Sequence, residues 1–436
     1  MVSVKSKILF LTACLLETVW LLLAQVIGSV YLLLPCLAVF VALTAWSAIK
    51  GMALPVLLYF LPFSSLLKIR PGTISLYTVA LLAVFAVYIV LGSRKIRVHH
   101  LIPGLLLIAF VLVVKTFTGD PVGTSFIVFA VSILAAPFLV RDFEGKYDFY
   151  WLTLFFALGI IVAAITSRYL AIFPTIARFI RKLSISGITR HSGYFNDPNF
   201  YAAHITAAMS GILILFLSQQ KKIRMAVSVV GLMLLAFCGF LSVSKSFLLI
   251  VACVVIMWFL TFLFQRGKLS VKITWIMTML VGVAFLLSAT VFTDLIDMML
   301  VRFGGIESLS DLTTHRSELL MNYLREFEEN PIVLFFGKGC STDLLNGRGT
   351  HNTLLQIIYQ LGIVGGVVLA AWGLTFIKTI LEETKIRWDV LPQIIILLIG
   401  CVGPWMGLDY FFQDEFFLMP LFVCAGIRHM CQTQES

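Results

Sequence analysis

The stretch ILFLTACLLETVWLLLAQVI, residues 8–27, contains a single charged side chain, Glu17. A helix over these residues rises about 30 Å, which matches the hydrocarbon thickness of a bilayer. The stretch is long for the apolar part of a signal peptide, and no clear small-residue cleavage site accompanies it. We therefore interpret it as a first membrane span, and similar apolar runs recur along the rest of the chain.

The composition of the whole chain indicates the same class of protein. Of the 436 residues, 60% are hydrophobic and 12% are charged, and the mean hydropathy is +1.01. A soluble protein of this size needs more charged side chains on its surface. The sequence thus predicts an all-α polytopic membrane protein with about 14 (12–14) transmembrane helices. The expected segments are residues 8–27, 29–48, 52–67, 74–92, 101–118, 121–140, 149–171, 199–218, 225–242, 246–264, 272–292, 353–379, 390–408 and 412–427.

Positive charge predicts the orientation of these segments. When the N-terminus is placed inside, every inner connection carries Lys or Arg, and both termini are cytoplasmic. Two outer segments oppose this rule, residues 66–73 and residues 168–196, and the second holds no carboxylate. Basic charge kept on the translocated side is best explained by an anionic ligand there. The residues concerned are Lys68, Arg70, Arg168, Arg178, Arg181, Lys182 and Arg190.

Four segments organise the chain, and one of them is a long polar loop. We expect an N-terminal transmembrane bundle, a set of central helices with a basic outer segment at 172–198, an extracytoplasmic loop, and C-terminal helices. Within the loop, apolar residues at helical spacing predict an amphipathic helix over residues 314–330. A second short amphipathic helix is expected over residues 173–185, with Arg178, Arg181 and Lys182 on one face, and it either lies among lipid headgroups or forms a wall of the site. The four segments are residues 1–171, 172–292, 293–352 and 353–436.

The turn Thr350-His351-Asn352 opens a late span and is the first candidate site. A histidine at the first turn of a helix feels the positive end of the helix dipole, which favours neutral imidazole. Neutral imidazole can take a proton at physiological pH, so His351 is a candidate general base. Asn352 either orients the imidazole or the acceptor, or it caps the helix.

A second turn, Arg190 to Asn199, opens the span at residues 199–218. Asp197 followed by Pro198 is typical of a helix cap with proline in the first helical position. This local role does not account for Arg190, which lies just before a helix start together with other basic residues. Such a place is a natural pocket for an anion.

Three further features of the outer side bear on the site. Arg316 begins the loop helix and either pairs with a local carboxylate, Glu318 or Glu326, or faces the site. Lys245 occupies a very short outer turn, from which its amine reaches either the headgroups or the site. Asp409, Asp414 and Glu415 form a late acidic cluster whose members either contact sugar hydroxyls or are solvated loop residues.

The cysteines give no sign of a disulfide framework or a metal site. Seven of the eight lie in or beside apolar spans, Cys340 alone lies in a long polar loop, and none has CxxC spacing. The outer loops also lack a DxD-type acidic pair, so the sequence predicts no metal in the site.

These motifs, taken together, resemble the O-antigen ligase and Wzy-type O-antigen and capsular polysaccharide polymerase family. The family pattern of His, a polar residue, nine residues and Gly-x-x-Gly is similar to His351, Asn352, residues 353–361, Gly362 and Gly365. An Arg-x-x-x-Leu element corresponds to Arg316 and Leu320, and the turn with Arg190, Gly193, Asp197, Pro198 and Asn199 is similar to a further family motif. Relatives carry Ser-Arg where this chain has Ser-Lys at Lys245, which puts a bidentate phosphate contact there in doubt.

The resemblance implies an extracytoplasmic inverting glycosyltransferase of a bacterial cytoplasmic membrane. Its donor would be a glycan on polyprenyl (undecaprenyl) pyrophosphate, its acceptor a sugar hydroxyl, and a chain-length regulator protein a further partner. His351 would act as the base, with Asn352 and Asn199 beside the substrate. Arg190, Arg316, Arg70, Lys68 and Lys245 would bind the pyrophosphate or glycan. No cofactor, metal or nucleic acid is expected.

Two other functions remain open on the residues alone. A ligase that transfers the glycan to lipid A core or protein uses the same chemistry as a polymerase, which we favour. A transporter or flippase of a lipid-linked glycan also suits many spans and a basic cavity. It would need buried charge at the membrane midplane, where only Glu17 stands well inside an expected span.

Overall fold

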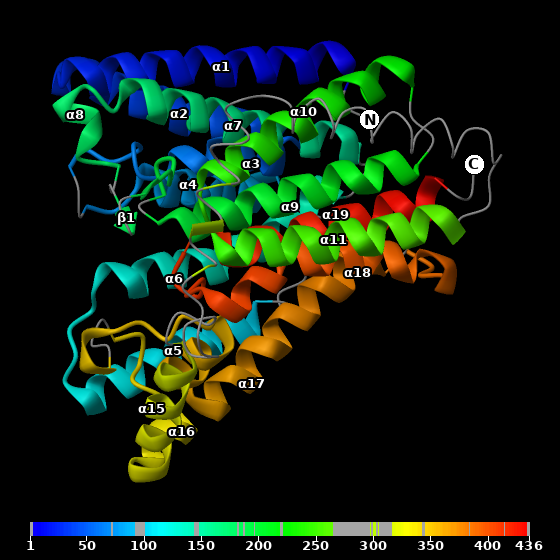
Figure 1. Ribbon diagram of the computed structural model, residues 1–436. Coiled ribbons are helices and arrows are strands. Elements are labelled where there is room, and N and C mark those ends of the chain that lie inside the picture. The colour runs from blue at the N-terminus through cyan, green and yellow to red at the C-terminus, as the bar shows by residue number, and fades with distance from the viewer. Residues whose placement is uncertain are drawn as a thin grey trace.

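The computed structural model describes residues 3–70, 73–91, 101–143, 148–180, 183–185, 188–195, 197–218, 221–264, 316–341, 345–382, 384–413 and 415–433, together with Asp297, Leu300, Val301 and Gly304. These residues form a mainly helical protein, as the composition predicts (Figure 1). The helices are α1 (Val4–Ile27), α2 (Val30–Ile49), α3 (Ala53–Phe60), α4 (Leu76–Leu91), α5 (Ile102–Thr118), α6 (Thr124–Ala135), α7 (Phe149–Leu170), α8 (Pro174–Ala177), α9 (Pro198–Leu217), α10 (Lys222–Leu241), α11 (Lys245–Phe264), α15 (Arg316–Glu329), α16 (Pro331–Phe336), α17 (Thr353–Leu381), α18 (Leu391–Cys401) and α19 (Glu415–Thr433). Short 3-10 turns are η1 (Leu61–Phe63), η3 (Ala136–Phe143), η4 (Leu345–Gly347), η5 (Trp388–Val390) and η6 (Gly403–Gly407).

Within the described residues, nine helices are long and apolar enough to cross a membrane. Four expected segments form shorter apolar helices, and the segment expected at residues 272–292 lies outside the described residues, so the count of about fourteen is not confirmed. The segment at 52–67 shows the reason. Its helix α3 has 8 residues, all of them buried, and ends in a 3-10 turn at Pro62. An apolar run of this length forms a short helix in the core.

Helix α1 shows the lipid-facing pattern that a membrane span requires. Leu9, Leu16 and Leu23 are all more than half exposed along one side of the helix, whereas Phe10 and Leu21 are buried on the other. An exposed row of leucines is unfavourable in water and favourable against lipid chains. The sequence therefore makes α1 apolar on all sides, because one face contacts lipid chains and the other packs against the apolar core of the protein.

The ends of the bundle differ in what they carry. The N- and C-terminal ends lie together on the right of Figure 1, and α8, strand β1 and α15 lie on the left. We call these the terminal end and the loop end. Both predicted basic outer segments and the predicted loop helix belong to the loop end, so the candidate site residues are gathered at one end of the molecule.

The helix expected over residues 173–185 is wrong for most of its length. Helix α8 ends at Ala177, and strand β1 (Leu183–Ile185) pairs with strand β2 (Ile188–Arg190) in an antiparallel hairpin. Leu183 lies opposite Arg190 in the register. The expected face with Arg178, Arg181 and Lys182 therefore does not form on one helix, and the last two residues lie outside the described residues. The loop helix expected over residues 314–330 is confirmed as α15.

Helix α17 is broken near its first third. Gly362 has φ 66° and ψ −178°, which is not helical, and the backbone of α16 at Phe335 lies so close that a Cβ atom at Gly362 would overlap it. The amides of Lys338 and Gly339 donate to the carbonyls of Tyr359 and Gln360, at 3.0 and 2.9 Å. Irregular backbone at a membrane helix is tolerated where protein groups satisfy it. Gly362 thus has a structural role in docking α16.

Candidate active site

The site is built on the first turn of α17. Asn352 is the N-cap, because its side-chain oxygen accepts from the Leu355 amide at 3.1 Å. Of the roles open to Asn352 in the sequence, the structure shows the helix cap. His351 directly precedes the cap at φ 47°, a backbone region that non-glycine residues seldom adopt. Its side chain is 49% exposed and so can meet a ligand.

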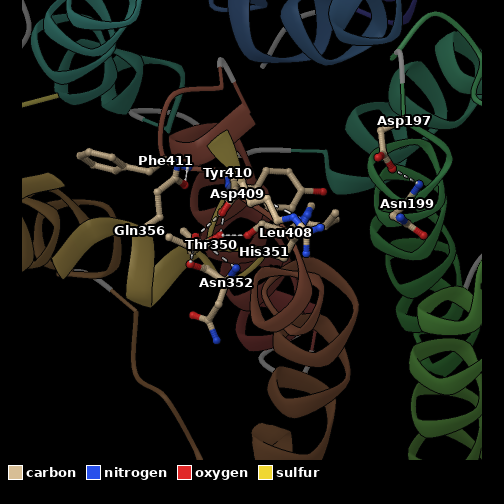
Figure 2. A network of polar contacts seen from close by, with 12 residues as sticks. Asp197, Asn199, Thr350, His351, Asn352, Gln356, Leu408, Asp409, Tyr410 and Phe411 are labelled. Atoms are coloured by element: carbon tan, nitrogen blue, oxygen red, sulfur yellow. Dashed lines mark hydrogen bonds and ion pairs between the residues drawn. The ribbon is translucent and has the colours of Figure 1, made fainter. Parts of the chain in front are cut away.

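A second segment, residues 408–411, crosses this turn and is fastened to it. The Thr353 hydroxyl donates to the Leu408 carbonyl at 2.6 Å and accepts from the Tyr410 amide at 3.1 Å. The Gln356 side chain accepts from the Phe411 amide at 3.0 Å. Both side chains are buried, so these bonds are shielded from water. Together they fix the position of Asp409 beside the start of α17, as Figure 2 shows.

Asp409 is the group that joins the site together. Its Oδ1 accepts from the Thr350 hydroxyl, and its Oδ2 lies 3.9 Å from Nδ1 of His351, within ion-pair range. Only 21% of the Asp409 side chain is exposed. A Cβ atom at Gly349 would overlap Oδ2, so glycine at this position allows the two segments to approach each other closely. Asp409 is therefore not an ordinary solvated loop residue.

Arg316 approaches the segment that carries Asp409 from α15. Its guanidinium lies against Gly407, where an added Cβ would overlap Nη1. Burial lowers the pKa of Arg316, and the nearby carboxylates of Asp197 and Asp409 oppose that shift. Arginine remains charged at any physiological pH. The local pairing expected with Glu326 is not what positions it, since that carboxylate binds Lys338 at 3.7 Å.

Arg190 lies at the end of β2 and is 6% exposed. Its Nε donates to the Ser242 carbonyl at 3.1 Å, and its Nη2 donates to Oδ1 of Asn199 at 3.0 Å. The Ser244 hydroxyl donates to the same Asn199 oxygen at 2.8 Å. The guanidinium thus joins the hairpin to the start of α9 and to the turn before α11, and Lys245, which is half-buried, begins α11 at this point.

Asp197 connects the Arg190 network to Arg316. It is the N-cap of α9, as its sequence predicts, and accepts from the Asn199 amide at 2.6 Å. In Figure 2 it stands at the start of α9, across from the residues that open α17. Its carboxylate also acts on Arg316. The carboxylates of Asp197 and Asp409 thus both act on the Arg316 guanidinium, and Asp409 also faces His351.

Lys68 and Arg70 lie in another region of the loop end. The buried Gln25 near the end of α1 donates to the carbonyls of Leu66 and Lys68, at 2.7 and 3.3 Å, and accepts from Arg178 at 3.5 Å. In the part of the chain that the structure describes, no hydrogen bond or ion pair joins Lys68 or Arg70 to His351 or Arg316. The structure thus gathers Arg316 with His351 and places these two cations apart.

His191, the second histidine of the predicted motifs, is a packed scaffold residue. Its Nε2 lies 3.2 Å from both the Ser167 hydroxyl and the Ala164 carbonyl on α7. Burial lowers the pKa of His191 to about 4, Arg168 adds to this shift, and the Ala164 carbonyl opposes it. The ring is therefore neutral at physiological pH and cannot be assigned the role of an exposed base.

Sequence reasoning underrated three features of the site. Asp409 stood in an acidic cluster that loop solvation could explain, and Asp414 of that cluster lies outside the described residues. Gly407 gave no signal, because only the position of Arg316 makes a glycine necessary there. Arg348, three residues before His351, is exposed, and its carbonyl accepts from the buried Tyr323 hydroxyl at 2.8 Å. Its positive charge, three residues before His351 in the sequence, is the signal from which Arg348 could have been predicted.

The residues around His351 do not resemble a metal centre. Across the described ranges, no three His, Cys, Asp or Glu residues come together as ligands, and all eight cysteines are free. The absence of a metal from the reaction stays a prediction. In comparisons with known proteins, no family model matches the chain and no curated protein is similar to it.

Proposed function

We propose that this chain is an extracytoplasmic inverting glycosyltransferase that polymerises repeat units carried on polyprenyl pyrophosphate in a bacterial cytoplasmic membrane. The observation that carries the proposal is the position of Asp409, which lies 3.9 Å from the His351 imidazole and acts on the Arg316 guanidinium. An accessible base and a cationic, anion-binding group thus lie near one carboxylate. This pair is what glycosyl transfer from a pyrophosphate needs.

His351 supplies the base in this reaction. With Asp409 at Nδ1, the proton of neutral imidazole is held on that nitrogen, and Nε2 is left to accept a proton. The acceptor hydroxyl gives its proton to Nε2 while its oxygen attacks the anomeric carbon. Asp409 stabilises the imidazolium that forms, as the carboxylate of a catalytic triad does. The distance of 3.9 Å is longer than a hydrogen bond, and we expect it to shorten when substrate binds, as contacts between catalytic groups commonly do.

Arg316 receives the charge of the leaving group. As the new carbon–oxygen bond forms, the bond from the anomeric carbon to the pyrophosphate oxygen breaks, and its electron pair leaves with the lipid pyrophosphate. The configuration at the anomeric carbon is inverted. The pyrophosphate gains one negative charge, which a guanidinium stabilises through paired hydrogen bonds. Arg190 is already bonded within the protein and acts as a positioning residue for the start of α9.

The decisive experiment uses the purified full chain in nanodiscs with an undecaprenyl-pyrophosphate-linked repeat unit. We expect lengthened lipid-linked glycan from the wild-type protein. Asp409→Asn keeps the size of the side chain but removes its charge, so kcat should fall by about 10- to 100-fold. Lys385→Ala, an exposed substitution at the terminal end, is the matched control and should not change the rate. If the wild-type protein does not lengthen the glycan of any lipid-linked donor, the proposal is refuted.

The same assay separates the polymerase from its alternatives. Transfer only when lipid A core or a protein acceptor is added would identify a ligase. In a second assay the protein is placed in sealed vesicles. Movement of the lipid-linked glycan across the vesicle membrane, unaffected by His351→Ala, would identify a flippase. The polymerase predicts lengthening with the lipid-linked repeat unit as both donor and acceptor.

A further inference from the structure

An apolar groove of about 440 Å³ runs along α17 beside the start of α19. Its wall extends along α17 from Leu354 to Ile377, and Phe416, Phe417 and Pro420 of α19 close one side. The described residues that line it are all apolar or glycine. Because α17 is one of the helices suited to span the membrane, the groove lies where hydrocarbon is the solvent. Its chemistry suits a hydrocarbon chain and excludes a charged or sugar-like group.

The groove begins at the candidate active site. Leu354 is in the first turn of α17, two residues after the cap Asn352. On the other wall, the Phe416 ring packs on Trp405 and Phe411, with centroids 5.1 and 5.4 Å apart. Phe411 belongs to the segment that holds Asp409. An occupant of the groove would therefore have one end beside the His351 and Arg316 groups and the remainder within the bilayer.

Glycines give the groove its depth. A Cβ atom at Gly373 would meet nothing within 4 Å, and at Gly366 it would meet only the Ile357 Cγ2 at 3.7 Å. From Ile363 to Ile377 the helix rises about 21 Å, most of the roughly 30 Å hydrocarbon layer. A chain lying here could remain in contact with the protein through much of the membrane. A short acyl group would leave most of this wall bare.

We propose that this groove binds the polyprenyl chain of the lipid-linked donor and so places its pyrophosphate at Arg316. The inference rests on the proposed function for the identity of the lipid. A lipid with a charged head and a long apolar chain fits the groove best, because the groove joins a charged site at one end and is apolar along the rest. The lipid is thus recognised in two parts, by charge at the loop end and by hydrocarbon contact along α17.

The test compares two neighbouring tryptophan substitutions. Gly373→Trp fills the groove, whereas Leu374→Trp adds a similar ring at a position that is 65% exposed and outside the groove. With undecaprenyl pyrophosphate as the probe, Gly373→Trp should weaken binding about tenfold, the effect of losing contact for about two methylene groups. Leu374→Trp should bind like wild type. Inorganic pyrophosphate, which has no chain, should bind equally to all three proteins.

A second variant and a crosslink identify the occupant. Gly366→Leu should weaken binding of undecaprenyl pyrophosphate in the same direction, which guards against misfolding of one variant. A photoreactive residue at position 373 should crosslink added undecaprenyl pyrophosphate. Equal loss of binding in Leu374→Trp, or crosslinks only to bulk phospholipid or to another part of this chain, would overturn the inference. These readouts need no turnover, so failure of the proposed transferase activity is seen separately.

Discussion

The two turns at the loop end are alike in sequence and differ in structure. Each has a histidine shortly before a helix that starts with a side-chain cap, Asp197 on α9 and Asn352 on α17. His191 is packed against α7 and the Tyr201 ring, whereas His351 is half exposed and faces Asp409. The comparison shows that burial and the neighbouring charge, rather than the motif, decide which histidine is available for proton transfer.

Replacing the two histidines should give the largest contrast. In His351→Ala the general base is lost, and kcat for glycan lengthening should fall by about 10² to 10⁴-fold. Donor binding should be largely retained, because the ring is not the group that holds the pyrophosphate. In His191→Ala the loss is one of stability, about 1–3 kcal/mol for the unsatisfied partners on α7.

Rates measured at equal amounts of folded protein, with thermal unfolding followed in parallel, separate these outcomes. If His191→Ala loses turnover as severely as His351→Ala while remaining folded, His191 also takes part in the reaction. Earlier unfolding of His191→Ala alone would support its structural role.

The two arginines extend the contrast to binding. Arg316→Lys keeps the charge but loses the paired donors, so binding of undecaprenyl pyrophosphate should weaken by about 10-fold. Arg190→Lys cannot hold both the Ser242 carbonyl and Asn199, so it should lower the unfolding temperature with a smaller change in affinity. Calorimetric titration of both variants measures this. A larger loss of affinity in Arg190→Lys than in Arg316→Lys would indicate that Arg190 binds the pyrophosphate.

Much of the fold follows from the sequence because lipid-facing helices are apolar on every side. Helices α7 and α9 lie within about one residue of their expected segments, and α1 ends where expected but begins four residues earlier. The β1–β2 hairpin was missed because each strand has three residues, too few to establish an alternation. The break in α17 was missed because a Gly-x-x-Gly pattern does not by itself tell a close packing site from a kink.

Only part of the site could be predicted from the sequence. The motifs predict His351 and Arg316 as site residues, but they do not indicate which carboxylate lies near both. Asp409 reaches that place through hydrogen bonds from Thr353 and Gln356 to a segment 55 residues further along the chain. Such pairing depends on the three-dimensional path of both segments. Likewise, the burial of Arg190 comes from contacts with the turn before α11, which no local pattern encodes.

Two glycines in η6 offer a finer test of Arg316. Gly407→Ala places a methyl group where the guanidinium lies, whereas a Cβ at Gly403 has its nearest neighbour 3.9 Å away. The first substitution should displace Arg316 and lower turnover by about fivefold, as about 1 kcal/mol of overpacking does. Gly403→Ala should behave like wild type. Equal rates for the two variants would show that the position of Arg316 does not limit the reaction.

The smallest expected effect is the pH dependence of stability at His191. Its pKa is lowered by burial from about 6.5 to about 4, so between these values the unfolded chain binds a proton that the folded chain does not. The contribution to stability is therefore complete above about pH 6.5 and is lost as the pH falls towards 4. In the wild-type protein the unfolding temperature should fall between pH 7 and pH 5, and His191→Gln should reduce that fall. A fall that is as steep in His191→Gln as in wild type would show that protonation of His191 does not cause it, and the distinction between the two turns would then rest on Asp409 alone.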